Sequence, residues 1–211
     1  MTEYRLLIDG QLVPGDMTME VVNPAHEQVL ALAPRASKAQ LDAAVAAAKA
    51  AFPGWAARPI EDRRALILTL ADRIEAEAEA LARLLTQEQG KPLPEAQAEI
   101  AYTCAFIRHL AGYDLPVKVI EDNESRLVRQ FRKPLGVVAA IIPWNFPVLI
   151  VAFMLPLALL AGNTMVVKPA PTTPLTTLKL GEIMAEVLPA GVVNIVTDQN
   201  DLGAELTTHP D

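Results

Sequence analysis

The sequence lacks a second cysteine, an excess of basic charge and a recognisable targeting segment, and each absence excludes a class of protein. Cys104 is the only cysteine among 211 residues, so no internal disulfide can form. The net charge of -7 gives no basic surface for nucleic acid or anionic lipid. Nothing before Arg35 combines a basic region, an apolar run and a cleavage site. We therefore expect a cytoplasmic protein that binds neither nucleic acid nor membrane.

Charge is also absent from a long internal stretch. No charged residue and no histidine occurs from Gly136 to Val167, which is longer than the roughly 20 residues that span a bilayer. A membrane helix is therefore one interpretation. However, Pro143, Asn145, Pro147 and Pro156 interrupt the stretch, which favours a buried strand, a turn and a helix.

Two common ligand-site signatures are missing as well. The ten glycines are scattered and form neither GxGxxG nor GxxxxGK[ST], so neither usual phosphate-binding loop is present. His26, His109 and His209 have no ligand spacing, and we expect no metal site. Cys104 shares the apolar face of a predicted helix with neighbouring isoleucines, which indicates a core residue and not a nucleophile.

The N-terminal part is predicted to contain a hairpin followed by helices. Asp9-Gly10 suits a type I′ turn between short strands at residues 5–8 and 11–13. Ser37 to Gln40 has the form of a capping box. We expect three helices, from this box to about Phe52 before Pro53-Gly54, from Ile60 to Gly90, and from about Pro94 to Gly112.

The second part changes period. Glu124 to Lys133 alternates apolar and basic residues, which is typical of an exposed strand or arm. After Gly136 the pattern predicts β-α units, with strands at 137–142, 164–167 and 192–196, helices at 148–160 and 175–188, and a short helix from about Asp201. Continuous Val and Ile runs indicate parallel strands buried on both faces.

These patterns predict an α/β protein with an incomplete, Rossmann-like, doubly wound parallel sheet. We divide it into an N-terminal hairpin segment (1–36), a helical segment (37–115), an arm strand (116–135) and the sheet unit (136–211). Because the sheet would have few strands, we also expect an uncovered edge and a tendency to aggregate.

Ligands of such sheets bind at the carboxyl ends of the strands. The first strand leads into Pro143 to Pro147, where two prolines fix a turn that carries Asn145. The carboxamide of Asn145 could donate a hydrogen bond to a developing oxyanion. The alternative is that Asn145 caps the next helix. The second strand ends at Lys168, which could bond a ribose hydroxyl or a phosphate, or could simply be a solvated lysine.

At these residues the chain resembles the aldehyde dehydrogenase superfamily. The segments "GVVAAIIPWNFP", "AGNTMVVKPAPTTPLTTLKLGE" and "LPAGVVNIV" resemble the opening of that family's cofactor domain in order and spacing. The resemblance extends over nearly the whole chain, which covers somewhat under half of a typical member. It implies oxidation of an aldehyde to a carboxylic acid with NAD or NADP.

The resemblance also implies roles for individual residues. Asn145 matches the family asparagine of the oxyanion hole, and Lys168 matches the lysine that bonds the adenosine ribose. Ile142, Pro143 and Trp144 match the segment that lines the cofactor site. Where many members carry a glutamate for the ribose 2′-hydroxyl, this chain has Pro171, so the usual argument for NAD over NADP does not apply.

In members of the family, the nucleophilic cysteine and the general-base glutamate lie C-terminal to the region that this chain matches. The resemblance therefore implies that these 211 residues alone oxidise no aldehyde. It also implies a homo-oligomer, a dimer or tetramer, with Glu124 to Lys133 as part of the arm. The second hypothesis is a non-catalytic binding or assembly fragment that pairs with a dehydrogenase subunit.

Overall fold

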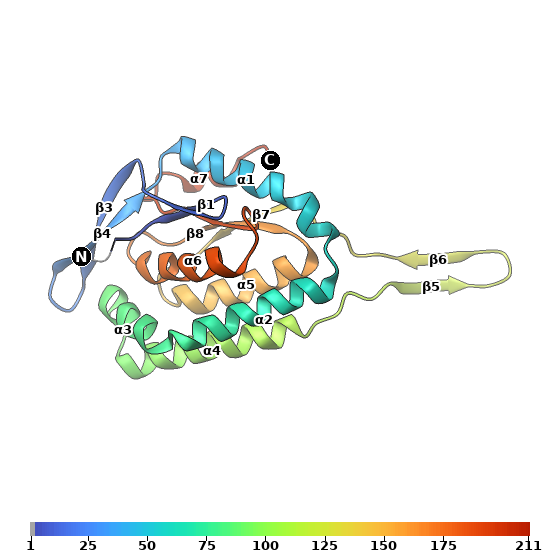
Figure 1. The fold of residues 1–211 in the computed structure, drawn as a ribbon, viewed down its shortest axis with the longest axis horizontal. Coiled ribbons are helices and arrows are strands. Elements are labelled where there is room, and N and C mark those ends of the chain that lie inside the picture. Colours follow the sequence, from blue (N-terminus) through green and yellow to red (C-terminus); the bar gives the residue numbers. More distant parts are fainter. Residues whose placement is uncertain (1–2) are drawn as a thin grey trace.

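A computed structural model describes residues 3–211 and shows one central sheet with helices on both faces (Figure 1). The sheet has five strands in the order β2-β1-β9-β8-β7. Its strands are β1 (Leu6–Ile8), β2 (Gln11–Val13), β7 (Val137–Ile141), β8 (Thr164–Lys168) and β9 (Val193–Ile195). The α/β prediction is confirmed.

The three predicted parallel strands form the core of this sheet. In the ladder, Val138 pairs with Met165, and Met165 pairs with Val193. Every residue of β8 and β9 is buried, as expected for strands covered on both faces. The parallel register places the carboxyl ends of all three strands at one edge.

The N-terminal hairpin joins the same sheet. Asp9 and Gly10 have φ values of 52° and 73°, which confirms the type I′ turn between β1 and β2. Strand β1 then pairs antiparallel with β9, with Leu7 opposite Ile195. The start of the chain therefore covers the edge of β9, and the predicted uncovered edge lies at β7, which pairs only with β8 among the described strands.

A second hairpin was not expected from the sequence. Strands β3 (Met17–Asn23) and β4 (Gln28–Arg35) pair antiparallel in a separate two-stranded sheet. Apolar residues occur on both faces of this hairpin, since Val22, Val29 and Leu32 are exposed while Val21 is buried. Apolar and polar residues therefore do not alternate clearly along the sequence. That weak alternation explains why the period-2 signal is difficult to read.

Three long helices make most of the helix contacts with the central sheet. Helix α1 (Lys38–Ala57) covers one face, and α5 (Pro147–Ala161) and α6 (Leu175–Val187) cover the other (Figure 1). The capping box of Ser37 and Gln40 is present at the start of α1. The predicted end at Pro53 is wrong, because the helix continues to Ala57. Trp55 holds this last turn, since its buried indole donates to the carbonyl of Leu159 at 3.1 Å.

Three further helices form an outer layer against α5 and α6. The single long helix predicted from Ile60 to Gly90 is in fact two, α2 (Ile60–Ala76) and α3 (Ala78–Gln89). They separate at Glu77, whose backbone leaves helical geometry at φ -104° and ψ 11°. No glycine or proline marks this break, so the sequence gives no signal for it. The third predicted helix is confirmed as α4 (Leu93–Ala111).

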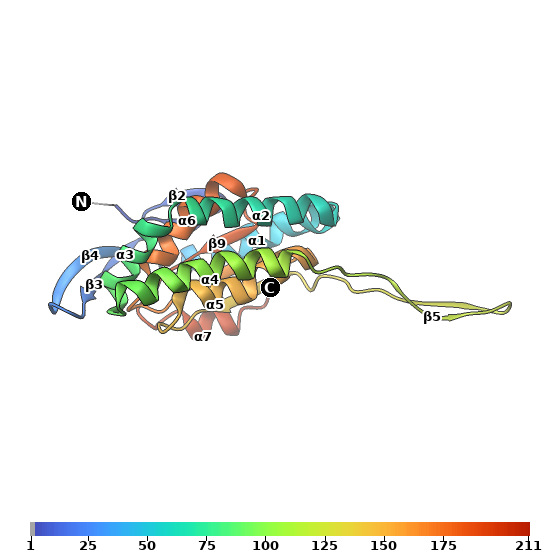
Figure 2. The ribbon, with the colours of Figure 1, turned by 90° about the horizontal axis from the view of Figure 1, so that it is seen from below.

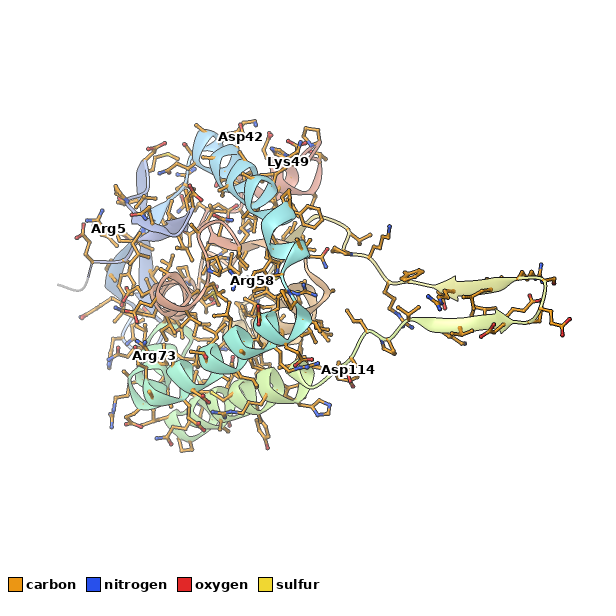
Figure 3. All side chains as sticks on the ribbon, turned by 45° about the vertical axis from the view of Figure 1, so that its right-hand side comes forward. Arg5, Asp42, Lys49, Arg58, Arg73 and Asp114 are labelled. Atoms are coloured by element: carbon orange, nitrogen blue, oxygen red, sulfur yellow. The ribbon has the colours of Figure 1, made fainter. Side chains whose placement is uncertain are left out.

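Residues 113–135 leave the body as a long arm (Figures 1 and 2). The arm is a hairpin of β5 (Lys118–Asp122) and β6 (Leu127–Gln130), so the predicted exposed strand has an antiparallel partner. Beyond Asp114 its side chains project into open space (Figure 3). The arm leads directly into β7 and is therefore attached at the amino end of that strand.

The uncharged stretch from Gly136 to Val167 forms β7, α5 and most of β8. Among the described helices, none has the length and apolarity needed to cross a membrane. The short helix predicted near the end of the chain is present as α7 (Gly203–Thr207).

Candidate cofactor and oxyanion site

The two loops singled out in the sequence lie side by side. Ile141 pairs with Lys168 in the β7-β8 ladder, and the backbone N–H of Ile142 donates to the carbonyl of Lys168 at 2.9 Å. The turn that carries Asn145 and the loop that follows Lys168 therefore start from the same point at the carboxyl edge of the sheet. This is the edge at which open α/β sheets bind ligands.

Asn145 is exposed in the turn between β7 and α5. Phe146 occupies the N-cap position of α5, and no side chain of the turn bonds to the first N–H groups of the helix. The alternative prediction that Asn145 caps α5 is therefore wrong. Its carboxamide makes no capping hydrogen bond and is available to bind a ligand.

A buried glutamate from another helix takes the place of the missing cap. Glu99 of α4 accepts hydrogen bonds from the backbone N–H groups of Val148 and Leu149 on one oxygen, at 3.0 and 3.1 Å. A carboxylate at this position also complements the positive end of the α5 dipole. The start of α5 is thus fixed by the helical layer.

Lys91 completes this support. Its ammonium group pairs with the other oxygen of Glu99 and donates to the backbone carbonyl of Asn145 at 3.0 Å. It also lies 4.2 Å from the centre of the Phe146 ring, a cation-π distance. The Lys91 and Glu99 side chains are 8% and 0% exposed. One buried ion pair therefore bonds both the backbone of the turn, at Asn145, and the backbone of the first turn of α5, at Val148 and Leu149.

Glu88, at the end of α3, makes the equivalent contact with α6. It accepts from the backbone N–H groups of Leu175 and Thr176, at 2.7 and 2.9 Å, and from the Thr176 hydroxyl. Burial raises the pKa of Glu88 to about 7, although these hydrogen bonds oppose the rise. The loop between β8 and α6 is thus fixed in the same way as the loop between β7 and α5.

A cavity of about 580 Å³ lies where these loops meet. Trp144 reaches it from the loop after β7, Pro171 from the loop after β8, and Gln199 from the loop after β9. Thr173, in the same loop as Pro171, has a buried hydroxyl with no hydrogen-bond partner among the described residues. Strand β3 and the end of α3 complete the wall. The cavity has the size and position of a small-molecule site.

Lys168 is not the solvated lysine that one interpretation predicted. Its side chain is 5% exposed, and its ammonium group donates to Asp198 Oδ1 at 2.7 Å. Asp198 follows β9, so this ion pair joins the loops of two neighbouring strands. Neither residue lines the cavity itself, but both are adjacent to loops that do.

The remaining predicted site residues differ in what they can offer a ligand. Ile142 is 1% exposed, so only its backbone is available. Pro143 and Trp144 are exposed in the turn. Pro171 presents an apolar ring to the cavity and no hydrogen-bond acceptor from its side chain.

Four charged residues of this edge were missed in the sequence, namely Glu88, Lys91, Glu99 and Asp198. A signal existed for two of them. Glu88 follows Leu81 and Leu85 at helical spacing, and Glu99 lies beside Ile100 on the buried face of α4. A carboxylate on an apolar stripe indicates a buried partner.

Cys104 is a core residue, as predicted. Its side chain is 1% exposed in the helical layer, and burial raises the pKa of the thiol to about 11. A thiol with this pKa is almost entirely protonated at neutral pH and is a poor nucleophile. Among residues 3–211, no three His, Cys, Asp or Glu side chains are grouped as metal ligands would be.

Three parallel strands whose following loops converge on one cavity define an open α/β protein with a candidate small-molecule site at the carboxyl edge of the sheet. A sequence profile of the aldehyde dehydrogenase family matches residues 12–211. The mitochondrial aldehyde dehydrogenase of Leishmania tarentolae is 41% identical over 99% of the chain, which covers 43% of that protein.

Solved structures agree with the profile. Betaine aldehyde dehydrogenase of Staphylococcus aureus, in complex with NAD+, is 30% identical with a TM-score of 0.94, over 99% of this chain and 44% of its own. An NADP-dependent enzyme of E. coli is 36% identical with a TM-score of 0.94, over 99% of this chain and 45% of its own. The chain belongs to the aldehyde dehydrogenase family, and it spans under half the length of these relatives.

Proposed function

We propose that this chain forms part of an oxidoreductase that converts an aldehyde to a carboxylic acid with NAD(P)+. The observation that carries the proposal is the meeting of the loops after β7, β8 and β9 at one cavity, with Asn145 and Lys168 on the same edge. Family membership supplies the reaction class. When bound, NAD(P)+ supplies the hydride acceptor.

In this proposal the residues of the turn after β7 have two roles, binding of the oxyanion and contact with the cofactor. The exposed carboxamide of Asn145 donates a hydrogen bond to the oxygen that gains negative charge during reaction. The exposed ring of Trp144, the Pro143 ring and the backbone of Ile142 line the cofactor side. Lys168 holds a ribose hydroxyl from the loop after β8.

The nucleophile is not among the described residues in this proposal, because the thiol of Cys104 is buried in the helical layer and protonated at neutral pH. The 211-residue chain should therefore bind NADH without oxidising aldehydes. The test is to measure NADH binding by tryptophan fluorescence and turnover with a panel of aldehydes and both oxidised cofactors. Turnover above a no-enzyme control would contradict the inactivity, and failure to bind either dinucleotide would contradict the cofactor site.

A matched pair of variants tests the role of Asn145. In an active family polypeptide that carries residues 1–211, Asn145→Ala should lower kcat about 100-fold or more, the usual cost of losing an oxyanion donor. Gln97→Ala, which removes an exposed carboxamide on α4, should leave kcat unchanged. Equal rates for the Asn145 variant and the parent would refute the role.

We further propose that residues 116–135 are an oligomerisation arm within the four-segment division of the chain. The arm exposes apolar side chains that a second subunit could cover, including Val119, Ile120 and Phe131 at 51%, 55% and 60% exposure. A dimer or tetramer in the cytoplasm fits the proposed enzyme.

The assembly hypothesis differs from this proposal in one respect, because it makes pairing with a dehydrogenase subunit the chain's only function. Light scattering after size-exclusion chromatography separates the outcomes. Replacing Val119, Ile120 and Phe131 by serine should convert a discrete oligomer to a monomer, whereas an unchanged mass would contradict the role of the arm. NADH binding by the chain would favour the enzyme over the assembly hypothesis.

A further inference from the structure

Pro171 leaves the ribose site without the carboxylate that distinguishes NAD from NADP in many nucleotide-binding proteins. Another carboxylate lies next to the predicted ribose-binding lysine. We propose that Asp198 takes over this function and makes the site select NAD over NADP. This inference rests on the proposed function, because it assumes that Lys168 meets the adenosine ribose.

The carboxylate of Asp198 is held by two hydrogen bonds from different elements. Its Oδ1 accepts from the Lys168 ammonium group at 2.7 Å, and its Oδ2 accepts from the backbone N–H of Leu202 at 2.8 Å. The side chains of Lys168 and Asp198 are 5% and 0% exposed. The negative charge is therefore fixed in place and poorly solvated.

The position of this charge disfavours a 2′-phosphate. A ribose oxygen bonded to Lys168 Nζ lies within about 6 Å of Asp198 Oδ1, because the two hydrogen bonds add to that length at most. A phosphate at this distance repels a buried carboxylate, and screening by salt is weak where water is excluded. A hydroxyl carries no charge and is tolerated.

The cations of this region are also already neutralised. Asp198 compensates Lys168, and Asp201 of the same loop pairs with Arg35 at 2.6 Å. A site for NADP requires a free cation for the 2′-phosphate, typically an arginine. The loop after β9 therefore both repels the phosphate and occupies the groups that would bind it.

The experiment compares NADH and NADPH binding to the whole chain, by tryptophan fluorescence and by calorimetry. The unsubstituted chain should bind NADH more tightly than NADPH. In Asp198→Asn, which keeps an acceptor for the Leu202 N–H, the ratio of the two dissociation constants should move toward NADPH by about tenfold or more. Asp198→Ser is the second variant, and thermal unfolding identifies which variants are folded.

Glu186→Gln is the matched control, because it also removes one negative charge from the chain. Glu186 pairs with Arg73 on the surface, at the end of α6 furthest from the carboxyl edge of the sheet. Its NADH to NADPH ratio should equal that of the unsubstituted chain. A shift as large as that of Asp198→Asn would show a general charge effect and would overturn the proposal.

A rescue variant adds a readout that a purely structural ion pair would not give. Adding Pro171→Glu to Asp198→Asn restores a carboxylate beside the ribose and should return the preference to NADH. Folded Asp198 variants that bind both dinucleotides with an unchanged ratio would overturn the inference and leave the proposed function intact. Failure of the unsubstituted chain to bind either dinucleotide would overturn both.

Discussion

Removing the ammonium group of Lys91, in the loop between α3 and α4, should destabilise the protein more than any surface substitution on α4. Lys91→Met leaves the carboxylate of Glu99 buried and without its counter-ion, although it still accepts from the Val148 and Leu149 N–H groups. Breaking one side of a buried ion pair typically costs about 3 to 5 kcal/mol. Domains are stable by about 5 to 15 kcal/mol, so this loss is a large fraction of the total.

The double-mutant cycle separates the pair from its surroundings. In Glu99→Gln the amide oxygen can keep both backbone N–H groups of α5, but the amide nitrogen then faces the Lys91 ammonium group. The double variant carries neither the Lys91 nor the Glu99 charge. Its loss in free energy of unfolding should therefore be smaller than the sum of the two single losses by about 1 to 3 kcal/mol. Urea unfolding followed by circular dichroism gives all four free energies.

Two further measurements make this reasoning refutable. Glu95→Gln, on the exposed face of α4, is the matched control and should leave the unfolding midpoint nearly unchanged. In Glu99→Ala, hydrogen exchange at the Val148 and Leu149 amides should accelerate more than in the rest of α5. Additive single costs, or exchange that does not change at these amides, would show that the pair does not hold the Asn145 turn.

Three other predictions concern stability and reactivity. Burial holds the pKa of Glu88 near 7, above its usual 4.5, so its contribution to stability is complete below about pH 4.5 and is lost as the pH rises through about 7. Glu88→Gln should remove about 3 kcal/mol of this pH dependence, measured by urea unfolding at pH 5 and pH 8; parallel profiles for parent and variant would contradict the burial. Gly191→Ala should lower the free energy of unfolding by about 2 to 4 kcal/mol, because φ is +75° and a Cβ would lie 2.7 Å from the Ala47 carbonyl oxygen. Gly54→Ala is the control and should be neutral or stabilising, because a Cβ at Gly54 would meet open space. Cys104 should react with iodoacetamide at pH 7.5 only after unfolding, and rapid labelling of the folded chain would refute its burial.

The elements that the sequence predicts well are those with a strong local signal. The β-α units after Gly136 follow from continuous Val and Ile runs, and the hairpin at Asp9-Gly10 follows from its turn residues. The failures occur where distant packing overrides local preference. Helix α1 passes through Pro53 because Trp55 is anchored to α5, and β1 covers the edge of β9 from nearly two hundred residues away.

The candidate site shows the same division. Asn145 and Lys168 could be predicted because strand ends of a parallel sheet meet at one edge. Their supports could not be placed, because Glu88, Lys91 and Glu99 come from the helical layer and depend on its packing. Asp198 was missed because a lone aspartate after a strand looks like any solvated loop residue until its buried partner is known.

A crystal structure of the chain grown with NAD+ tests the proposed site most directly. The dinucleotide should lie along the carboxyl edge of β7, β8 and β9, with its adenosine ribose bonded to Lys168 and its nicotinamide beside Asn145. A dinucleotide bound elsewhere, for example in the cavity near Tyr4, Leu30 and Leu84, would contradict the assignment of the site.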